Sequence, residues 1–291
     1  METILRSPSG KEVIIAPDRS TVMIGERINP SGGGRKKLTA ALAAMDMELV
    51  KAEAIRQVAA GARVIDVNVQ AADILGQESE TLVAAIEAVA SVVDVPISID
   101  TNDRAAMPAA LKVCPGRPLI NSVTGEEESL RSVLPLAAEY GACLIGLTAD
   151  DDGIPMTDPY KRLEIATKIV RRAEEYGLPP EDIIIDCVTL PIGAELTAAA
   201  VTMKAMRLVR EELGVNLASG ASNVSFGMPM RSLINTGFLF MIIAAGVNAP
   251  IVDPMKMRET VVAADLLVGR DAFAERYLAY YRELQAQPAP A

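Results

Sequence analysis

The sequence predicts an α/β protein that folds as one closed (β/α)₈ barrel. Apolar, strand-like runs alternate with amphipathic helical segments through the chain, which is typical of a parallel barrel. Because the strands of a barrel end at one mouth, we expect the polar residues at the strand ends to face a single pocket for a small planar ligand rich in hydrogen-bond donors and acceptors. These residues are Asn29, Asn68, Asp100, Asn121, Asp150, Asp186, Asn223 and Asp253.

Composition supports a single barrel. The chain has 291 residues, of which 50% are hydrophobic and only 3% aromatic, so aliphatic side chains must fill the core. Such usage suits parallel strands that are covered on both faces, and one barrel needs roughly 250 residues. No repeat or linker divides the sequence. We therefore predict one domain over residues 1–291, with the barrel at about 20–270.

The individual strands and helices are predicted from apolar runs and from the residues that begin and end them. One helix is predicted to bury a face made of Met45, Leu49, Ala52, Ile55 and Ala59. A last helix over about 271–284 is expected to pack across the barrel, and residues 285–291 are expected to be disordered. The eight strands are predicted at residues 21–25, 63–69, 96–100, 119–123, 142–148, 182–186, 216–224 and 249–253.

Charge and cysteine content exclude several classes of partner. The formal net charge is −10, from 28 basic and 38 acidic residues, which argues against a nucleic-acid partner. The separated Cys114, Cys143 and Cys187 indicate reduced thiols in a cytoplasmic protein rather than a zinc site. The start of the chain is too polar for a signal peptide. The most apolar stretch, 238–252, is too short to span a bilayer.

Histidine is absent from the chain. This excludes Ser-His-Asp hydrolases, HExxH metalloenzymes and any imidazole acid–base mechanism. Two loops have no assigned role. The acidic loop 150–152 is interpreted as solvated rather than as a cation site. The glycine-rich stretch 30–37 is either a plain solvated loop or a contact for an anionic tail.

Two strand-end carboxylates, Asp100 and Asp186, are predicted to face each other across the mouth. A glycosidase pair is disfavoured because the chain has no Trp, and a metal site because it has no His. The remaining interpretation is that the carboxylates accept paired hydrogen bonds from a guanidine-like edge of a ligand. Amides at Asn68, Asn121 and Asn223 offer both donors and acceptors to a heterocycle. The simpler alternative for any one of these residues is that it caps the following helix.

Six stretches at these strand ends resemble the pterin-binding barrel methyltransferases. The relatives suggested by this resemblance are methyltetrahydrofolate:corrinoid-protein methyltransferases and the folate module of cobalamin-dependent methionine synthase. The resemblance covers residues 20–270 and implies a barrel like that of dihydropteroate synthase. The stretches are 25–29 (GERIN), 65–68 (IDVN), 99–102 (IDTN), 120–123 (INSV), 185–186 (ID) with 190–191 (LP), and 222–227 (SNVSFG).

The resemblance also implies roles for individual residues. Asp100, Asn121 and Asp186 are expected to bind the amino-pyrimidinone edge of the pterin, with Asn68 and Ser222 lining the pocket. Asn223 is expected beside N5, the atom that carries the methyl group, with Gly220 and Arg231 orienting it. Asn223 and Asp186 are then the expected catalytic pair.

The implied reaction is methyl transfer between N5 of tetrahydrofolate and the cobalt of a corrinoid (cobalamin). A separate corrinoid protein is expected to carry the cobalt, and a homodimer is implied by stand-alone relatives. Dihydropteroate synthase is one alternative, although residues 253–258 lack the Arg-x-His of that family. A non-catalytic pterin-binding subunit of a corrinoid complex is another. The direction of transfer and the ultimate methyl donor stay open.

Overall fold

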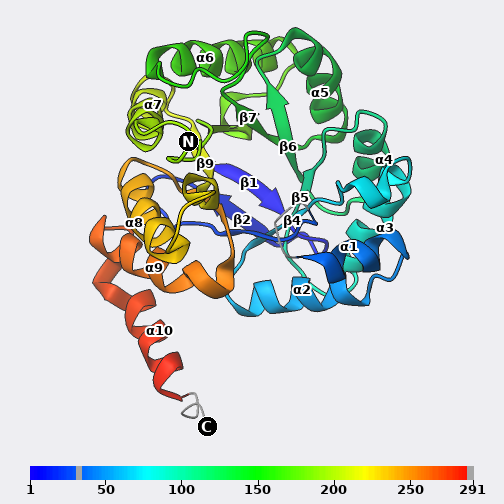
Figure 1. Cartoon of the computed structure of the whole chain (residues 1–291), viewed down its shortest axis with the longest axis horizontal. Coiled ribbons are helices and arrows are strands. Elements are labelled where there is room, and N and C mark those ends of the chain that lie inside the picture. Colours follow the sequence, from blue (N-terminus) through cyan, green and yellow to red (C-terminus); the bar gives the residue numbers. More distant parts are fainter. Residues whose placement is uncertain (31–34, 287–291) are drawn as a thin grey trace.

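Eight parallel strands close into a ring that helices surround in the computed structural model, which describes residues 1–30 and 35–286 (Figure 1). Strand order follows the chain, and the last strand pairs with the first to close the ring. The predicted (β/α)₈ barrel is therefore confirmed. The ring consists of β3 (Ile24–Ile28), β4 (Val64–Val67), β5 (Ile97–Asp100), β6 (Leu119–Thr124), β7 (Cys143–Leu147), β8 (Ile183–Asp186), β9 (Asn216–Gly220) and β10 (Ala249–Val252).

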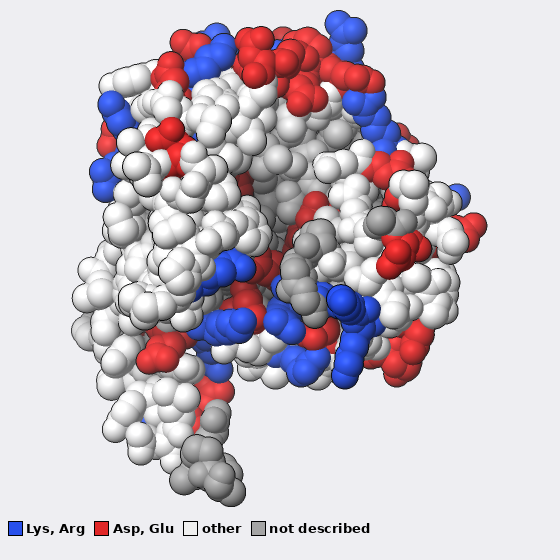
Figure 2. All heavy atoms as spheres, viewed as in Figure 1, with Lys and Arg blue, Asp and Glu red and all other residues white. Residues whose placement is uncertain are grey.

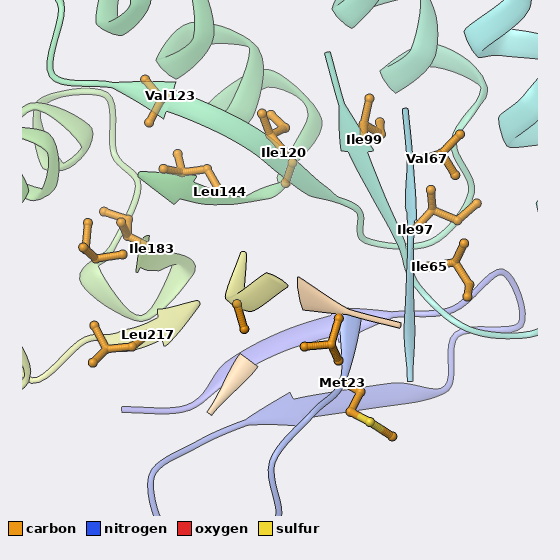
Figure 3. Packing of buried hydrophobic residues seen from close by; sticks show 14 of the residues in the cluster. Met23, Ile65, Val67, Ile97, Ile99, Ile120, Val123, Leu144, Ile183 and Leu217 are labelled. Atoms are coloured by element: carbon orange, nitrogen blue, oxygen red, sulfur yellow. The ribbon is translucent and has the colours of Figure 1, made fainter. Parts of the chain in front are cut away.

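Helices cover the outside of this ring. Their bounds are α1 (Lys36–Ala43), α2 (Glu48–Ala59), α3 (Glu78–Ala90), α4 (Ala106–Val113), α5 (Glu127–Tyr140), α6 (Pro159–Glu175), α7 (Ala198–Leu213), α8 (Arg231–Ala244) and α9 (Pro254–Leu267). Strand side chains such as Ile97, Ile120 and Leu144 fill the layer between strands and helices (Figure 3). Short aliphatic residues suffice there, which explains a core almost without aromatic residues. No helix among those described is long and apolar enough to cross a membrane.

A β-hairpin that the sequence interpretation missed packs into the barrel. Its strands are β1 (Thr3–Arg6) and β2 (Glu12–Ile15), paired antiparallel. Leu5, Val13 and Ile15 form one cluster with inward-facing residues of the ring, and Leu5 and Ile15 are fully buried. The polar mixture of residues 1–20 concealed the hairpin, because only alternate residues are apolar in a strand with one buried face.

The buried face of α2 differs from the prediction. Met45 precedes the helix and is exposed, and Ile55 is half exposed, whereas Val50, Glu53, Ala54 and Gln57 are buried. The prediction was wrong because it counted only apolar side chains. Glu53 and Gln57 point inward because they bind Arg27: Gln57 Oε1 accepts from the Arg27 backbone N–H at 2.9 Å, and Glu53 pairs with its guanidinium at 3.4 Å.

The helix after β7 begins and ends at residues that are typical of helix boundaries. Asp158 caps α6 by accepting from the backbone N–H groups of Tyr160 and Lys161, and Pro159 opens the first turn. Gly177, just beyond the end of this helix, has a positive φ of 80°.

The C-terminal helix forms but does not pack across the barrel as predicted. A 3₁₀ turn, Ala272–Ala274, precedes α10 (Glu275–Ala286), which contains no buried residue and projects away from the ring of helices (Figure 1). Residues 285 and 286 belong to this helix, so that part of the disorder prediction was wrong. Residues 287–291 lie outside the described part of the chain. The apolar periodicity of the helix was genuine, but periodicity does not specify what covers a helix face.

Candidate functional site

Four polar side chains from three adjacent strands form a connected cluster at the carboxyl end of the barrel. Asp100 and Asn121 are direct partners in the register of β5 and β6. Asn121 Nδ2 donates to Asp66 Oδ1 at 3.1 Å, and Asn68 donates to Asp100. The structure thus brings together three predicted residues, Asn68, Asp100 and Asn121. It adds Asp66, which appeared above only as part of a motif.

Asp66 and Asp100 share this cluster as an acidic pair. Burial and the neighbouring Asp100 raise the pKa of Asp66 well above its ordinary value. Burial also raises the pKa of Asp100, while hydrogen bonds from Asn68 and Asp66 act in the opposite direction. Two adjacent buried carboxyls favour holding one proton between them. The pair therefore offers both a donor and acceptors to a ligand. Asp66 was detectable in principle, since residues 66 and 68 lie two apart on one side of a strand.

The second predicted carboxylate, Asp186, lies at the end of β8 and is 5% exposed. Its Oδ1 accepts from the backbone N–H of Val188 at 2.7 Å, and its Oδ2 accepts from that of Gly220 at 3.2 Å. Burial raises its pKa to about 6, against the effect of these two hydrogen bonds and of Arg162. Each carboxylate oxygen keeps a further lone pair, so backbone bonding leaves acceptor capacity for a ligand.

The loop behind Asp186 is fixed by a fully buried cation. Arg162 of α6 donates through Nη1 to the carbonyls of Cys187 and Val188 at 2.6 and 3.0 Å, and to Thr202 Oγ1 at 2.9 Å. Val188 has a positive φ of 54°, which β-branched residues rarely adopt. The guanidinium thus holds a strained turn whose N–H group binds Asp186. The sequence did not reveal this role, because Arg162 lies on an otherwise apolar helix face.

Asn223 lies in a 3₁₀ turn, Ala221–Ser225, directly after β9. A Cβ on Gly220 would lie 3.0 Å from Asn223 Nδ2, so a larger residue there would displace this amide by a few tenths of an ångström. Arg231 braces the same turn. Its Nε donates to Ser225 Oγ at 2.9 Å and its Nη2 donates to the Ser222 carbonyl at 3.1 Å.

A cavity of about 980 Å³ adjoins this turn. Figure 2 shows the corresponding face hollowed near its centre, with acidic atoms inside the hollow and Lys and Arg along one edge. Its lining includes Asn223, Ser222 and Arg231 together with Glu26, Asn29 and Asp253, but not Asp100, Asn121 or Asp186. Most of the predicted residues therefore form two groups, one in the cluster around Asp66 and one beside the cavity, while Asp186 and Gly220, at the ends of β8 and β9, belong to neither.

Glu26, in the middle of β3, is a candidate that the sequence interpretation missed. It lines the cavity and is partly buried, and Ser222 Oγ donates to its Oε2 at 3.5 Å. Burial raises the pKa of Glu26 to about 7, with Arg35 acting in the opposite direction. The GERIN motif contained this residue, but spacing alone gives no sign of its burial.

Two other strand-end residues have structural partners. Asp253 caps α9 by accepting from the Met255 N–H and also pairs with Arg27 Nη1 at 3.1 Å. Asp150 accepts from the Asp152 N–H and lies 3.5 Å from Lys161 Nζ. Asp253 still lines the cavity, whereas Asp150 is not among its lining residues, so not every strand-end side chain faces one pocket as predicted. Over residues 1–30 and 35–286, no group of three or more His, Cys, Asp or Glu is arranged to hold a metal ion. Residues 31–34 of the glycine-rich stretch lie outside the described chain.

The three cysteines are free thiols. Cys143 and Cys187 are buried, and Cys114 is partly buried. Burial raises the pKa of the Cys143 thiol to about 12, so it is protonated and unreactive at neutral pH.

Residues 26–253 match the family described as pterin binding enzyme. The chain is 30% identical over 275 residues to the methylcorrinoid:tetrahydrofolate methyltransferase of Eubacterium limosum, covering 93% of this chain and 99% of that protein. It is 32% identical over 259 residues to the methionine synthase of Mycobacterium tuberculosis (strain ATCC 25618 / H37Rv), covering 83% of this chain but only 21% of that enzyme.

Among solved structures, Yersinia pestis dihydropteroate synthase (DHPS) with a pterine-sulfa conjugate superposes with a TM-score of 0.70. Sequence identity to it is 18%, over 92% of this chain and 100% of that one, which supports a shared fold and nothing finer. The family match covers most of the barrel, including both groups of predicted residues. The chain belongs to the pterin-binding enzyme family.

Proposed function

We propose that this protein is a methyltransferase that moves a methyl group between N5 of tetrahydrofolate and the cobalt of a corrinoid carried by a partner protein. The main support is the similarity to the methylcorrinoid:tetrahydrofolate methyltransferase, which extends over nearly the full length of both chains. The absence of histidine agrees with this proposal, since the reacting cobalt is supplied by another molecule. DHPS chemistry is less well supported, because its structural relatives are under 25% identical.

The pterin is proposed to lie against the strand-end cluster. The amino-pyrimidinone edge would form hydrogen bonds with Asp100, Asn121 and Asp186, both as donor and as acceptor, and Asn68 would lie beside them. The proton shared by Asp66 and Asp100 gives that side a mixed hydrogen-bonding character, which a heterocyclic edge requires. A buried hydrogen bond to a charged group contributes about 1.5–3 kcal/mol.

Asn223 is proposed to act at N5. Breaking the carbon–nitrogen bond leaves an electron pair on N5, and an amide N–H aimed at that atom stabilises the developing charge. Asp186, linked to Gly220, would support the orientation of Asn223 through a bound water. Gly220 and Arg231 fix the turn itself. Ser222 would line the pocket wall on the cavity side.

The corrinoid is proposed to arrive on a partner that docks over the barrel mouth, and the chain is proposed to act as a homodimer. Without histidine the chain has no imidazole that could ligate the cobalt of a corrinoid. Its own side chains would bind the pterin, exclude water and orient N5, while the corrinoid supplies the methyl-carrying metal.

Asn223→Ala tests the donor role. The expected result is a fall in turnover of roughly 10²–10³, the cost typical of losing one preorganised donor, with the Kd for 5-methyltetrahydrofolate within a few-fold of wild type. Rates are measured with free cob(I)alamin and the purified chain. Equal losses in turnover and binding would contradict the donor role. No transfer by the wild-type chain, together with intact pterin binding, would instead favour the non-catalytic subunit.

A further inference from the structure

Methyl transfer at N5 also moves a proton, and this part of the reaction has no assigned group. When reduced cobalt attacks the methyl carbon, its electron pair forms the cobalt–carbon bond and the carbon–nitrogen pair stays on N5, which then takes up one proton. In the reverse direction N5–H attacks the methyl group and releases that proton. The Asn223 amide stabilises charge, but it cannot be a net proton source at neutral pH.

Among the described carboxyl groups at or near the cavity, that of Glu26 has the fewest hydrogen-bond and ion-pair partners. Asp253 also lines this cavity, but it is bound by Arg27 at 3.1 Å and lies 3.8 Å from Lys256. Asp186 accepts from two backbone N–H groups. Over residues 1–30 and 35–286, no ion pair within 4.0 Å involves Glu26. Its carboxyl is therefore available to gain and lose a proton.

The surroundings of Glu26 keep its affinity for a proton near neutrality. Burial raises its pKa to about 7. The groups that interact with it from neighbouring elements are Arg35 before α1, Asp66 of β4, Ser222 in the 3₁₀ turn, Arg231 at the start of α8 and Asp253 at the start of α9. Arg35, Ser222 and Arg231 lower the pKa, whereas Asp253 raises it. A general acid or base works best with a pKa near the working pH.

Glu26 is connected to the turn that carries Asn223. Ser222 Oγ lies 3.5 Å from Glu26 Oε2, the outer limit of a hydrogen bond, and Ser222 immediately precedes Asn223. The Ser222 carbonyl is held by Arg231 at 3.1 Å. Glu26, Ser222 and Asn223 all line the 980 Å³ cavity, which has room for bridging water.

We propose that Glu26 is the proton reservoir of the methyl transfer and exchanges its proton with N5 through Ser222 or a water held between them. This inference rests on the proposed function, since it needs a reaction at N5. Protonated Glu26 supplies the proton when the methyl group leaves tetrahydrofolate, and ionised Glu26 accepts it when the methyl group arrives.

The test is the pH dependence of transfer in both directions, with free cobalamin and the full chain. For the wild type, transfer from 5-methyltetrahydrofolate should slow as pH rises through about 7, and the reverse reaction should accelerate over the same range. Glu26→Gln should lower the transfer rate at its pH optimum at least ten-fold and remove the dependence of the rate on pH around 7, referred to here as the pH limb. Its Kd for tetrahydrofolate should stay within three-fold of the wild-type value. Glu26→Asp should restore the limb in part.

Ser222→Ala provides a second variant should Glu26→Gln fold poorly, and it should weaken the same limb without abolishing pterin binding. Glu212→Gln, an exposed carboxyl on α7, is the matched control and should leave rates and pH profile unchanged. An unchanged rate and pH limb in Glu26→Gln, or in folded Ser222→Ala when Glu26→Gln does not fold, would overturn the inference while the proposed function stood. A wild-type chain that transfers no methyl group would overturn both.

Discussion

The carboxylate of Asp186 accepts a hydrogen bond from the backbone N–H of Gly220 at 3.2 Å. This contact joins the tip of β8 to the end of β9, where the turn bearing Asn223 begins. The residue proposed to bind the pterin edge thereby holds the backbone that carries the residue proposed to act at N5. This hydrogen bond therefore connects Asp186 to the turn that lies beside the cavity.

Gly220→Ala should disturb Asn223 without straining the backbone. Gly220 has φ −71° and ψ 74°, which alanine also adopts, but the added Cβ would lie 3.0 Å from Asn223 Nδ2. A displaced donor lowers the rate steeply, so we expect roughly a ten- to hundred-fold fall in turnover with little change in melting temperature. Gly237→Ala in α8, where nothing lies within 4 Å, is the control and should leave the rate unchanged. Equal rates in both variants would contradict this role of Gly220.

Arg162→Met should lower the free energy of unfolding by about 2–4 kcal/mol, because it leaves buried carbonyl and hydroxyl acceptors without their donor. The Cys187 and Val188 carbonyls lose their bonds to the guanidinium. Asp186 should then be less well positioned, and pterin affinity should fall as well. Urea denaturation and ligand titration measure the two effects. The control is Arg171→Met on the exposed side of α6; a similar loss there would refute the specific role of Arg162.

Leu5→Ala tests whether the hairpin stabilises the barrel from within. Leu5 is fully buried among inward-facing strand residues, and truncating such a residue costs about 2–5 kcal/mol. Activity of the remaining folded protein should be unchanged. The exposed Leu267→Ala should alter the unfolding free energy by less than about 0.5 kcal/mol. If the loss for Leu5→Ala is as small as that, the hairpin does not contribute to the core.

The unliganded chain should be more stable at pH 5.5 than at pH 8. The pKa of Glu26 is raised to about 7 and that of Asp186 to about 6, and both are raised by burial. Such groups hold protons in the folded state that the unfolded chain releases. Their contribution is therefore present at low pH and is lost as pH rises through these values.

Urea denaturation at several pH values should show a loss on the order of 2 kcal/mol between pH 5.5 and 8. The pKa of Glu127 is lowered by Arg172 and Lys168, so its ionisation changes stability in the opposite direction. It titrates below pH 5.5 and therefore does not contribute to the change between pH 5.5 and 8. Glu26→Gln should have a flatter profile than the wild type. Stability that increases toward pH 8 would show that these carboxyls do not ionise as described.

Most of the barrel could be predicted from the sequence, because aliphatic runs with polar ends encode buried parallel strands directly. All eight ring strands lie at the predicted places, with ends shifted by a few residues. Elements whose packing depends on polar side chains could not be predicted. The inward face of α2 uses Glu53 and Gln57, and the turn at Val188 depends on Arg162; both arise from tertiary partners that sequence periodicity does not contain.

The candidate site was predicted only in part, because the burial of polar groups depends on tertiary partners. Asn68, Asp100 and Asn121 were expected together and do lie together. Asp66 and Glu26 went unrecognised, because their distinctive property is burial of a charged group rather than spacing. The oligomeric state and the exposed α10 helix depend on surfaces for which the chain carries no local signal.

The most direct test of the central claim is titration of the chain with 5-methyltetrahydrofolate by calorimetry, with a fluorescence titration alongside, for wild type, Asp100→Asn and the exposed Asp152→Asn. The account predicts one site per chain in the wild type and unchanged binding in Asp152→Asn. Loss of a charged hydrogen bond should weaken binding to Asp100→Asn by roughly ten- to hundred-fold, or about 1.5–3 kcal/mol. No binding to the wild type, or equal affinity for all three proteins, would contradict it.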